Sequence, residues 1–339
     1  ETHTSFLKME SSEAGKKGKI CVTGGTGFIA SWIIKRLLED GYSVNTTIRS
    51  LPGRKRDVSY LTNLPGASQK LRFFNADLSE PESFKDAIDG CSGVLHTATP
   101  FDLQENESEE VVTKRTIEGA LGIIRACVNS NTVRRVVYTS SALAVVNNGK
   151  DDDVMDEGFW SDVNYLRRVK PFSWNYAVSK TLAEKAVLEF GQENGLEVVS
   201  LIPSLVSGPF FCPNIPGSVR LSLALLFGEK DQYGRLRRVH MVHVDDVARA
   251  HIFLLEHPNP KGRYNCSPFI VTIEEMAQLL SVKYPEFQIP SKESLEDIKG
   301  YKLPELCSKK LMDAGFEFKY GLEQMFDDAI QCCKEKGYL

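Results

Sequence analysis

Short β-branched runs alternate with longer amphipathic segments from Lys19 to Gly208, and this alternation limits the chain to very few folds. The apolar runs, in chain order, are KICVTG, YSVNTTIRS, KLRFFNADL, GVLHTATP, RRVVYTSS and LEVVSLIPSLVSG. Helix-like stretches such as SWIIKRLLEDG and TIEGALGIIRACVNS lie between them. Strands separated by helices connect through right-handed crossovers, which cover both faces of the sheet. The pattern therefore predicts an α/β fold with a doubly wound parallel sheet.

The pattern changes after Gly208, where a proline-rich loop, PFFCPNIPGS, begins. We expect residues 19–208 to form the parallel-sheet domain and residues 209–339 to form mainly a smaller lobe that holds the substrate. Within that lobe, residues 239–257 read as a strand and a helix, and we expect them to return to the sheet of the first domain. Residues 1–18 are polar and lack the apolar stretch of a signal peptide, so we expect a flexible extension in which Met9 is a candidate start.

Composition argues against several classes of partner. The chain of 339 residues has 41 basic and 45 acidic side chains, a net charge of -4, so it offers no extended basic field for nucleic acid. No window is apolar over the length that spans a bilayer. The eight cysteines are scattered without a C-x-x-C pair, which is typical of reduced thiols in a cytoplasmic protein. No histidine lies in a set of ligands that would bind a metal, and we predict none.

A glycine-rich turn follows the first predicted strand and leads straight into a helix pattern. It reads Thr23-Gly24-Gly25-Thr26-Gly27-Phe28-Ile29-Ala30. Glycines let backbone N–H groups approach a pyrophosphate closely, and the helix N-terminus adds partial positive charge. Such a turn can also be purely structural, but its place between strand and helix is the context that a dinucleotide-binding Rossmann domain requires. Thr23, Gly24, Gly27, Phe28 and Ile29 are therefore predicted to contact the cofactor.

Arg49 ends the second predicted strand, where an NAD enzyme would carry an acidic residue for the ribose hydroxyls. A guanidinium suits a 2'-phosphate, so the sequence favours NADPH or NADP+. Arg54, Lys55 and Arg56 could extend this basic site or form an ordinary solvated helix end. Further cofactor contacts are predicted at the carboxyl ends of other strands, where an ordinary strand-end role is the alternative. These residues are Asp77, Leu78, Thr97, Ala98, Thr99, Thr139 and Pro203.

Tyr176 is followed by Lys180 one helical turn later, and among the eleven tyrosines it alone has a lysine at that spacing. Ser141 ends the strand RRVVYTSS, so it should face the ligand crevice at the carboxyl edge of the sheet. A tyrosine with a pKa of about 10 needs a nearby cation to exchange a proton near neutral pH, and Lys180 supplies one. Ser141 would hydrogen-bond a carbonyl oxygen where charge develops. We predict Ser141, Tyr176 and Lys180 as catalytic, with Tyr176 and Lys180 also at the cofactor.

With these motifs in place, the chain resembles the dihydroflavonol 4-reductase group of extended short-chain dehydrogenase/reductases, and most of all its isoflavonoid-reducing members. The stretches that carry the resemblance include SVNTTIR, RKRDVS, FFNADLS, WNYAVSKTLAEKAVLEFG, HMVHVDDVARAH and FDDAIQCCKEKGYL. The resemblance implies a Rossmann fold, NADPH, and reduction of a ketone on a flavonoid-like ring. It also implies substrate contacts at Val146 and His240, where the family carries an asparagine and an amide. Trp174 and Phe210 are further candidates for an aromatic pocket, and core packing is their alternative role.

Several functions remain open on this pattern. The first expectation is an NADPH-dependent reductase of a plant aromatic ketone. The second is an NADP-dependent reductase, or an alcohol or hemiacetal dehydrogenase, acting on a non-flavonoid metabolite such as an alkaloid or terpenoid. A nucleotide-sugar epimerase shares the fold, and a non-catalytic dinucleotide sensor would be expected to carry a damaged triad. A monomer is the default, because no pair of exposed apolar helices suited to a dimer is evident.

Overall fold

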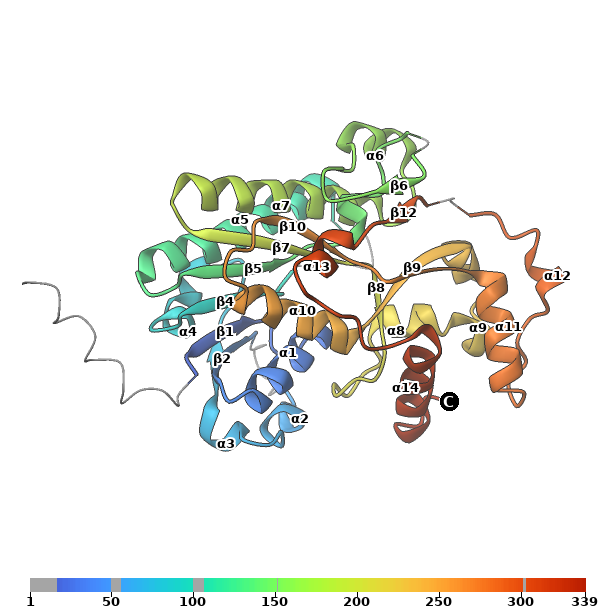
Figure 1. Ribbon diagram of the computed structural model, residues 1–339, viewed down its shortest axis with the longest axis horizontal. Coiled ribbons are helices and arrows are strands. Elements are labelled where there is room, and N and C mark those ends of the chain that lie inside the picture. The colour runs from blue at the N-terminus through green and yellow to red at the C-terminus, as the bar shows by residue number, and fades with distance from the viewer. Residues whose placement is uncertain (1–16, 50–55, 100–106, 151, 301–302) are drawn as a thin grey trace, which may run out of the picture.

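Seven parallel strands form the central sheet in the computed structural model, which describes residues 17–49, 56–99, 107–150, 152–300 and 303–339. Their order is β10-β7-β5-β4-β1-β2-β3 (Figure 1). The strands are β1 (Lys19–Thr23), β2 (Ser43–Ile48), β3 (Leu71–Asn75), β4 (Gly93–His96), β5 (Arg135–Thr139), β7 (Glu197–Pro203) and β10 (Gly262–Cys266). Most of their residues are buried on both faces, as the continuous apolar runs predicted. The predicted doubly wound parallel sheet is confirmed.

Helices cover the two faces of this sheet in two layers (Figure 1). α1 (Phe28–Glu39) and α10 (Val244–Glu256) pack together on one face, and α5 (Glu109–Ser130) and α7 (Trp174–Glu193) pack together on the other. Alternate strand residues supply the two cores: Val22 joins the cluster beneath α1 and α10, whereas Cys21 joins the cluster beneath α5. The sheet is therefore a rigid platform whose strand ends can carry a site.

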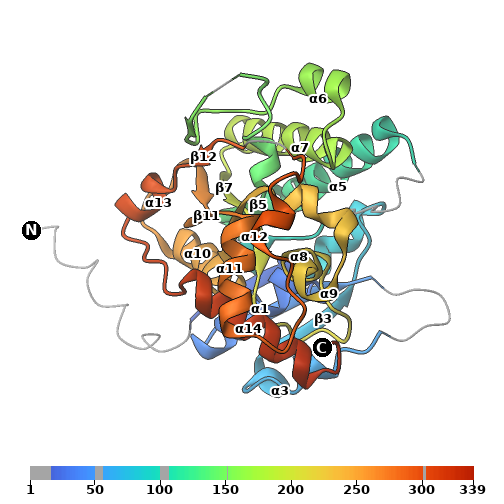
Figure 2. The same cartoon turned by 90° about the vertical axis from the view of Figure 1, so that its right-hand side faces the viewer.

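A second sheet of three strands builds the smaller lobe. Its order is β11-β9-β8, with β8 (Leu205–Ser207), β9 (Arg238–His243) and β11 (Phe269–Thr272). Around it lie α8 (Gly217–Ser222), α9 (Ala224–Phe227), α11 (Ile273–Lys283) and α14 (Leu322–Glu335), grouped toward the viewer in Figure 2. These elements share a hydrophobic core of their own. A capping box between Thr272 and Glu275 fixes the start of α11.

Shorter elements connect these layers. They are α2 (Ser59–Thr62), α3 (Ala67–Lys70), η1 (Pro81–Phe84), α4 (Lys85–Ile88), η2 (Ala142–Ala144), β6 (Val154–Met155), α6 (Val163–Val169), η3 (Lys230–Leu236), α12 (Lys292–Leu295), β12 (Glu305–Leu306) and α13 (Lys309–Asp313). β6 and β12 pair as a small two-stranded sheet.

One predicted boundary is wrong in part. Residues 239–257 were expected to return to the main sheet, but β9 pairs with β8 and β11 in the second sheet, and only α10 packs against the main one. The strand that does return is β10, at the edge beside β7. The cause is the path of the chain after Pro203, where β8 leaves the main sheet and aligns with β9.

The expected N-terminal extension lies mostly outside the described residues. The described chain starts at Lys17, which forms an ion pair of 2.8 Å with Glu256 and lies over the ring of Tyr42. The predicted extension of 1–18 is therefore too long by at least these last two residues, which contact the folded domain.

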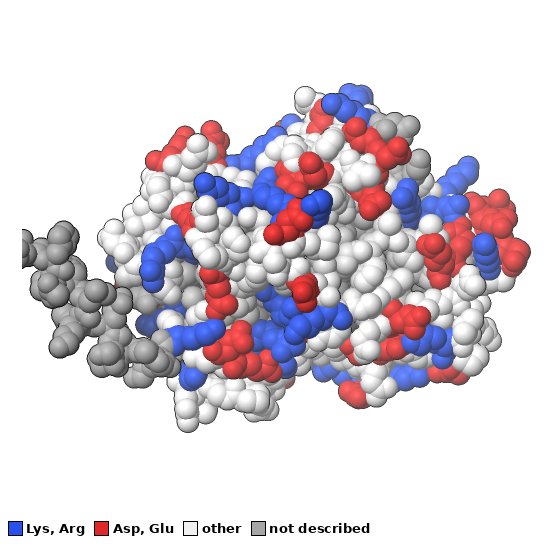
Figure 3. Space-filling view, in the orientation of Figure 1, with Lys and Arg blue, Asp and Glu red and all other residues white. Residues whose placement is uncertain are grey.

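The described surface carries mixed charge. On the face seen in Figure 3, basic and acidic side chains are interspersed among uncharged areas, and no large area has one sign. Within the described ranges, no helix combines the length and apolarity that crossing a membrane requires.

Candidate active site

The turn after β1 is held by the backbone of the neighbouring strand. Gly24 has a positive φ of 72°, and its N–H donates to Thr47 Oγ1 at 3.0 Å. The N–H of Gly25 donates to the carbonyl of Thr47, and that of Gly27 donates to the carbonyl of Gly24. A Cβ added to Gly24 would lie 3.2 Å from Ala98 at the end of β4. Glycine is therefore required here for conformation and for close approach.

The N-terminus of α1 opens directly from this turn. Its N-cap is Gly27, which has no side chain to accept from the first helical N–H groups, and no acidic residue lies in the first turn. Helix N-termini of this kind attract anions through unpaired N–H groups and the helix dipole. The turn and the start of α1 thus fit a pyrophosphate. Phe28 and Ile29 at this start are partly buried against the apolar core.

Basic side chains lie beside the turn. The Arg56 guanidinium donates to Thr26 Oγ1 at 2.7 Å, so its side chain lies against the turn. Arg49 is 58% exposed, with its Nε 4.0 Å from a carboxylate oxygen of Asp77. The backbone N–H and hydroxyl of Ser79 also donate to Asp77, and they hold the pKa of that carboxyl below its usual range. Arg54 and Lys55 lie outside the described residues.

The ends of β1 and β4 are linked through one hydroxyl. Thr23 Oγ1 accepts from the backbone N–H groups of Thr97 and Ala98, at 3.1 Å each, and lies 2.8 Å from His96 Nδ1. Thr97 Oγ1 donates to the carbonyl of Thr23. Thr23, Thr97 and Ala98, all predicted cofactor residues, are therefore joined in one small network at the carboxyl edge of the sheet. Leu78 is not part of this network and lies against Gly119 of α5.

Tyr176 and Ser141 meet at the start of α7. Their side chains are hydrogen-bonded, and Ser141 is the second residue after the end of β5 at Thr139. Burial raises the pKa of Tyr176 to about 12, although the hydrogen bond with Ser141 lowers this pKa. A tyrosine with this pKa stays protonated at neutral pH, so it can donate a proton.

Lys180 lies one turn further along α7 and is buried. Its Nζ donates to the carbonyl of Thr139 at 2.6 Å, to Tyr138 Oη at 3.2 Å and to Thr99 Oγ1 at 3.4 Å. Burial lowers the pKa of Lys180 to about 8, while the carboxylate of Glu184 acts in the opposite direction. The lysine therefore stays mostly charged at neutral pH. The Thr139 hydroxyl lies 2.7 Å from His251 Nε2, so the predicted residue Thr139 serves Lys180 through its carbonyl.

The four predicted substrate residues fall in different surroundings. Val146 is buried in an apolar cluster around η2, and Trp174 is partly exposed at the start of α7. Phe210 is only 2% exposed and packs into the core of the smaller lobe near Tyr338. Of its two predicted roles, the structure favours core packing for Phe210.

His240 lies on β9 and is 4% exposed. Burial lowers the pKa of His240 to about 4, so the imidazole is neutral at ordinary pH. Among the described residues its Nε2 has no hydrogen-bond partner, and the same holds for the buried hydroxyls of Ser204 and Ser267. Strand register makes these positions neighbours, because Leu205 pairs with Met241 and Pro203 pairs with Cys266. Pro203, a predicted cofactor residue, ends β7 beside them.

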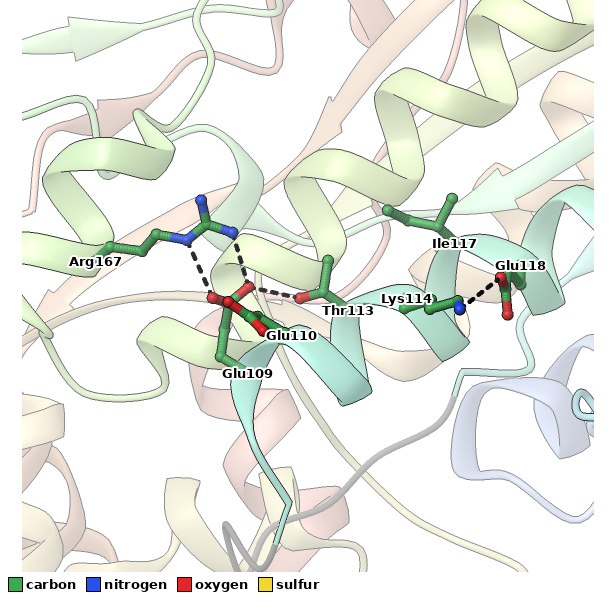
Figure 4. Close-up of a pocket in the computed structure, with 7 residues that line it drawn as sticks. All are labelled: Glu109, Glu110, Thr113, Lys114, Ile117, Glu118 and Arg167. Carbon is green, nitrogen blue, oxygen red and sulfur yellow. Dashed lines mark hydrogen bonds and ion pairs between the residues drawn. The ribbon is translucent and has the colours of Figure 1, made fainter.

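Two surface pockets lie away from the triad. One, of about 350 Å³ between α5 and α6, has Glu109 held by Arg167 and Thr113, while Lys114 pairs with Glu118 (Figure 4). Its charged groups are largely matched to one another, which indicates surface packing. The other, of about 880 Å³, lies beside the edge strand β10. Within the described ranges, no cluster of three or more potential ligands could hold a metal ion.

Sequence reasoning missed three residues around Lys180. Tyr138 accepts a hydrogen bond from the Lys180 ammonium, and Glu184 lies one turn after Lys180 on α7. His96 links β4 to Thr23. Burial lowers the pKa of His96 to about 3, so this imidazole adds no positive charge near Lys180. The spacing Tyr176, Lys180, Glu184 was a usable signal, since residues four apart share one helix face.

A Rossmann sheet with a glycine turn and a buried Ser, Tyr and Lys cluster defines a dinucleotide-binding protein of the short-chain dehydrogenase/reductase class. The model of the NAD dependent epimerase/dehydratase family matches residues 20–267. The chain belongs to this family.

The chain is also similar to individual reductases along nearly its whole length. Vestitone reductase from Medicago sativa is 68% identical over 323 residues, covering 95% of this chain and 99% of that protein. Its crystal structure matches with a TM-score of 0.87 and 66% identity, covering 95% of this chain and all of that one. A dihydroflavonol 4-reductase from Hordeum vulgare is 45% identical, covering 96% and 91%. The yeast methylglyoxal/isovaleraldehyde reductase Gre2, solved with NADPH, matches at 25% identity with a TM-score of 0.76, covering 95% and 100%. The predicted resemblance to the dihydroflavonol 4-reductase group is confirmed.

Proposed function

We propose that this protein is an NADPH-dependent reductase that converts the ketone of an isoflavanone, of which vestitone is an example, to the alcohol. The observation that carries the proposal is the hydrogen-bonded pair of Tyr176 and Ser141 with Lys180 one turn away, at the carboxyl ends of the strands. The 68% identity with vestitone reductase supports this substrate class. The proposal extends to a cytoplasmic, monomeric enzyme of plant specialised metabolism.

NADPH, when bound, supplies the hydride that adds to the carbonyl carbon. As the C=O π electrons move to oxygen, Ser141 donates a hydrogen bond to that oxygen and Tyr176 transfers its phenolic proton to it. The product is the alcohol, and Tyr176 is left as a phenolate. The ammonium of Lys180 stabilises this phenolate until it recovers a proton from solvent.

Cofactor preference follows from Arg49 and Arg56. Arg56 bonds Thr26 of the glycine turn, and Arg49 follows β2, which pairs in parallel with β1, the strand that leads into that turn. Arg49 is more than half exposed, and its contact with Asp77, at 4.0 Å, is long, so it is available to a phosphate. Both groups support NADPH over NADH.

The deciding experiment measures NADPH oxidation by the purified protein. The substrates are vestitone, a second isoflavanone, a dihydroflavonol, and unrelated plant ketones and aldehydes, with products identified by mass spectrometry. Tyr176→Phe is the control, and it should bind NADPH normally while losing turnover. Isoflavanone turnover that vanishes in Tyr176→Phe is the expected result. Full activity in that variant would refute the assigned chemistry.

One observation favours a second candidate. Val146 lies in an apolar cluster with Ala142, Val145 and Met155, where the resembled reductases carry an asparagine. An apolar wall offers no partner to a ring hydroxyl, so a less hydroxylated ketone, or an alcohol or hemiacetal oxidised with NADP+, would be accepted there. Turnover of such a compound with no reaction of vestitone would favour this candidate.

A further inference from the structure

Glu184 is a fully buried carboxylate next to the catalytic cluster. It lies on α7 one turn after Lys180 and two turns after Tyr176, so the three side chains share one helix face. Its Oε2 accepts from Ser140 Oγ at 2.6 Å and from Arg263 at 3.3 Å, and its Oε1 accepts from Arg263 Nε at 2.8 Å. A buried carboxylate with this many donors is held in one position.

Ser140 lies between two functional groups of the site. The residue before it, Thr139, gives the carbonyl that accepts from Lys180, and the residue after it, Ser141, bonds Tyr176. Ser140 itself is anchored twice, because its N–H donates to the carbonyl of Leu201 and its hydroxyl donates to Glu184. Rotation of the chain at Ser140 would therefore move the Thr139 carbonyl and the Ser141 hydroxyl together.

Arg263 fixes the other side of Glu184. It stands on the edge strand β10, donates to the carbonyls of Glu157 and Phe159, and lies over the ring of Trp160. These contacts tie the carboxylate to a part of the fold outside α7. The pair of Glu184 and Arg263 has no net charge, which makes its burial tolerable.

Four side chains near Lys180 can affect its charge. Tyr138 and Tyr176 stay protonated because burial raises the pKa of both, and His96 stays neutral because burial lowers its pKa. Glu184 is the one anion among them, and it raises the pKa of Lys180 against the effect of burial. Its charge therefore favours the ammonium form that the proposed proton transfer needs.

We propose that Glu184 is a positioning residue, which holds Ser141 and Lys180 in their reactive arrangement through its hydrogen bond with Ser140. The inference rests on the proposed function for its kinetic part. Its structural part, the anchoring of residues 139–141, is independent of the substrate.

The deciding variant is Ser140→Ala, because it removes the link and leaves Glu184 paired with Arg263. The matched control is Ser200→Ala, a fully buried serine on the adjacent strand whose hydroxyl has no partner among the described residues. In Ser140→Ala we expect kcat to fall about 10- to 100-fold, because displacing reacting groups by up to about 1 Å has an effect of this size. The KM for NADPH should stay within about twofold, because the glycine turn is untouched. Ser200→Ala should keep wild-type kcat.

Hydrogen exchange gives the readout that does not depend on turnover. Amides of residues 138–143 should exchange faster in Ser140→Ala than in wild type or Ser200→Ala, with the thermal midpoints of the two variants similar. Unchanged exchange together with unchanged kcat would overturn the proposal. If the wild type reduced no carbonyl compound, the proposed function would fail, while faster exchange in Ser140→Ala would still support the anchoring.

Glu184→Gln separates charge from hydrogen bonding, since the amide oxygen can still accept from Ser140. Loss of the anion lowers the pKa of Lys180, so the alkaline limb of the kcat profile should move to lower pH. In Ser140→Ala, where the charge remains, that limb should stay in place. An identical shift in both variants, or a shift in neither, would contradict the assigned division of roles.

Discussion

Replacing Tyr138 by Phe tests the electrostatics of Lys180 directly. The ammonium donates to Tyr138 Oη at 3.2 Å and lies 4.6 Å from the centre of the same ring. Phenylalanine keeps the ring and removes only the acceptor. A hydrogen bond to a charged group contributes roughly 1.5–3 kcal/mol, which corresponds to about 1–2 pKa units. The pKa of Lys180 should therefore fall from about 8 to between about 6 and 7.

The sign of the effect on rate follows from the role of the ammonium. Lys180 has to be charged to stabilise the Tyr176 phenolate, so the rate of reduction is high below the lysine pKa and is lost above it. At pH 7 roughly nine-tenths of the wild-type lysine is charged, against roughly a tenth to a half in Tyr138→Phe. The wild-type alkaline limb should lie near pH 8, and the variant limb about 1–2 units lower.

The assay measures kcat from about pH 5.5 to about pH 9.5 at saturating NADPH and substrate. Tyr42→Phe is the matched control, since Tyr42 also bonds a charged group, Glu256, but packs in a different hydrophobic cluster from Tyr138. The control should keep the wild-type limb. A Tyr138→Phe profile with the limb at its wild-type pH would refute the assignment of that limb to Lys180.

Three further predictions concern the cofactor and the substrate. Arg56→Gln should weaken NADPH binding about 10- to 100-fold by loss of a charge-assisted contact to phosphate, with NADH binding nearly unchanged, as measured by fluorescence titration. Gly24→Ala should lower both the thermal midpoint and the affinity for NADPH. A residue with a Cβ at a φ of 72° costs about 1–2 kcal/mol, and this Cβ would also press on Ala98. Retained affinity would argue against a role of the turn in cofactor binding. His240→Leu should raise the KM for vestitone several-fold and leave kcat within about twofold, and the effect should be the same at pH 6 and 8, because an imidazole with a pKa of about 4 is neutral at both.

The sequence was sufficient for the main sheet, because residues buried on both faces of a parallel strand form continuous apolar runs. It was insufficient for the pairing of β9 and β10. Both are short runs followed by a helix or a loop, and local pattern does not say which sheet a strand joins. That choice depends on the bend after Pro203, where β8 turns away and leaves the edge of β7 to β10.

The site, like the fold, has a part that the sequence predicted and a part that it did not. The convergence of Tyr176 and Ser141 was predictable, because one follows from helix spacing and the other from the position of strand ends. Tyr138 and His96 were hidden, since inside a strand they look like ordinary core residues. The role of Phe210 stayed open for a related reason: its aromatic character fits a pocket wall and a core equally, and the structure favours the core, where Phe210 packs near Tyr338.

Three buried polar atoms around His240 have no hydrogen-bond partner among the described residues, and they offer a reason why the substrate is harder to predict than the chemistry. His240 lies on β9, Ser204 in the link between β7 and β8, and Ser267 in the link between β10 and β11, so no sequence spacing connects them. Buried polar atoms without partners are costly, and that cost is relieved if a bound molecule or water supplies the missing hydrogen bonds. A hydroxylated ring entering beside β7 would do so. Ser204→Ala and Ser267→Ala should therefore stabilise the free protein or leave it unchanged, while raising the KM for a hydroxylated substrate. A loss of stability without a change in KM would assign these hydroxyls to a structural water instead.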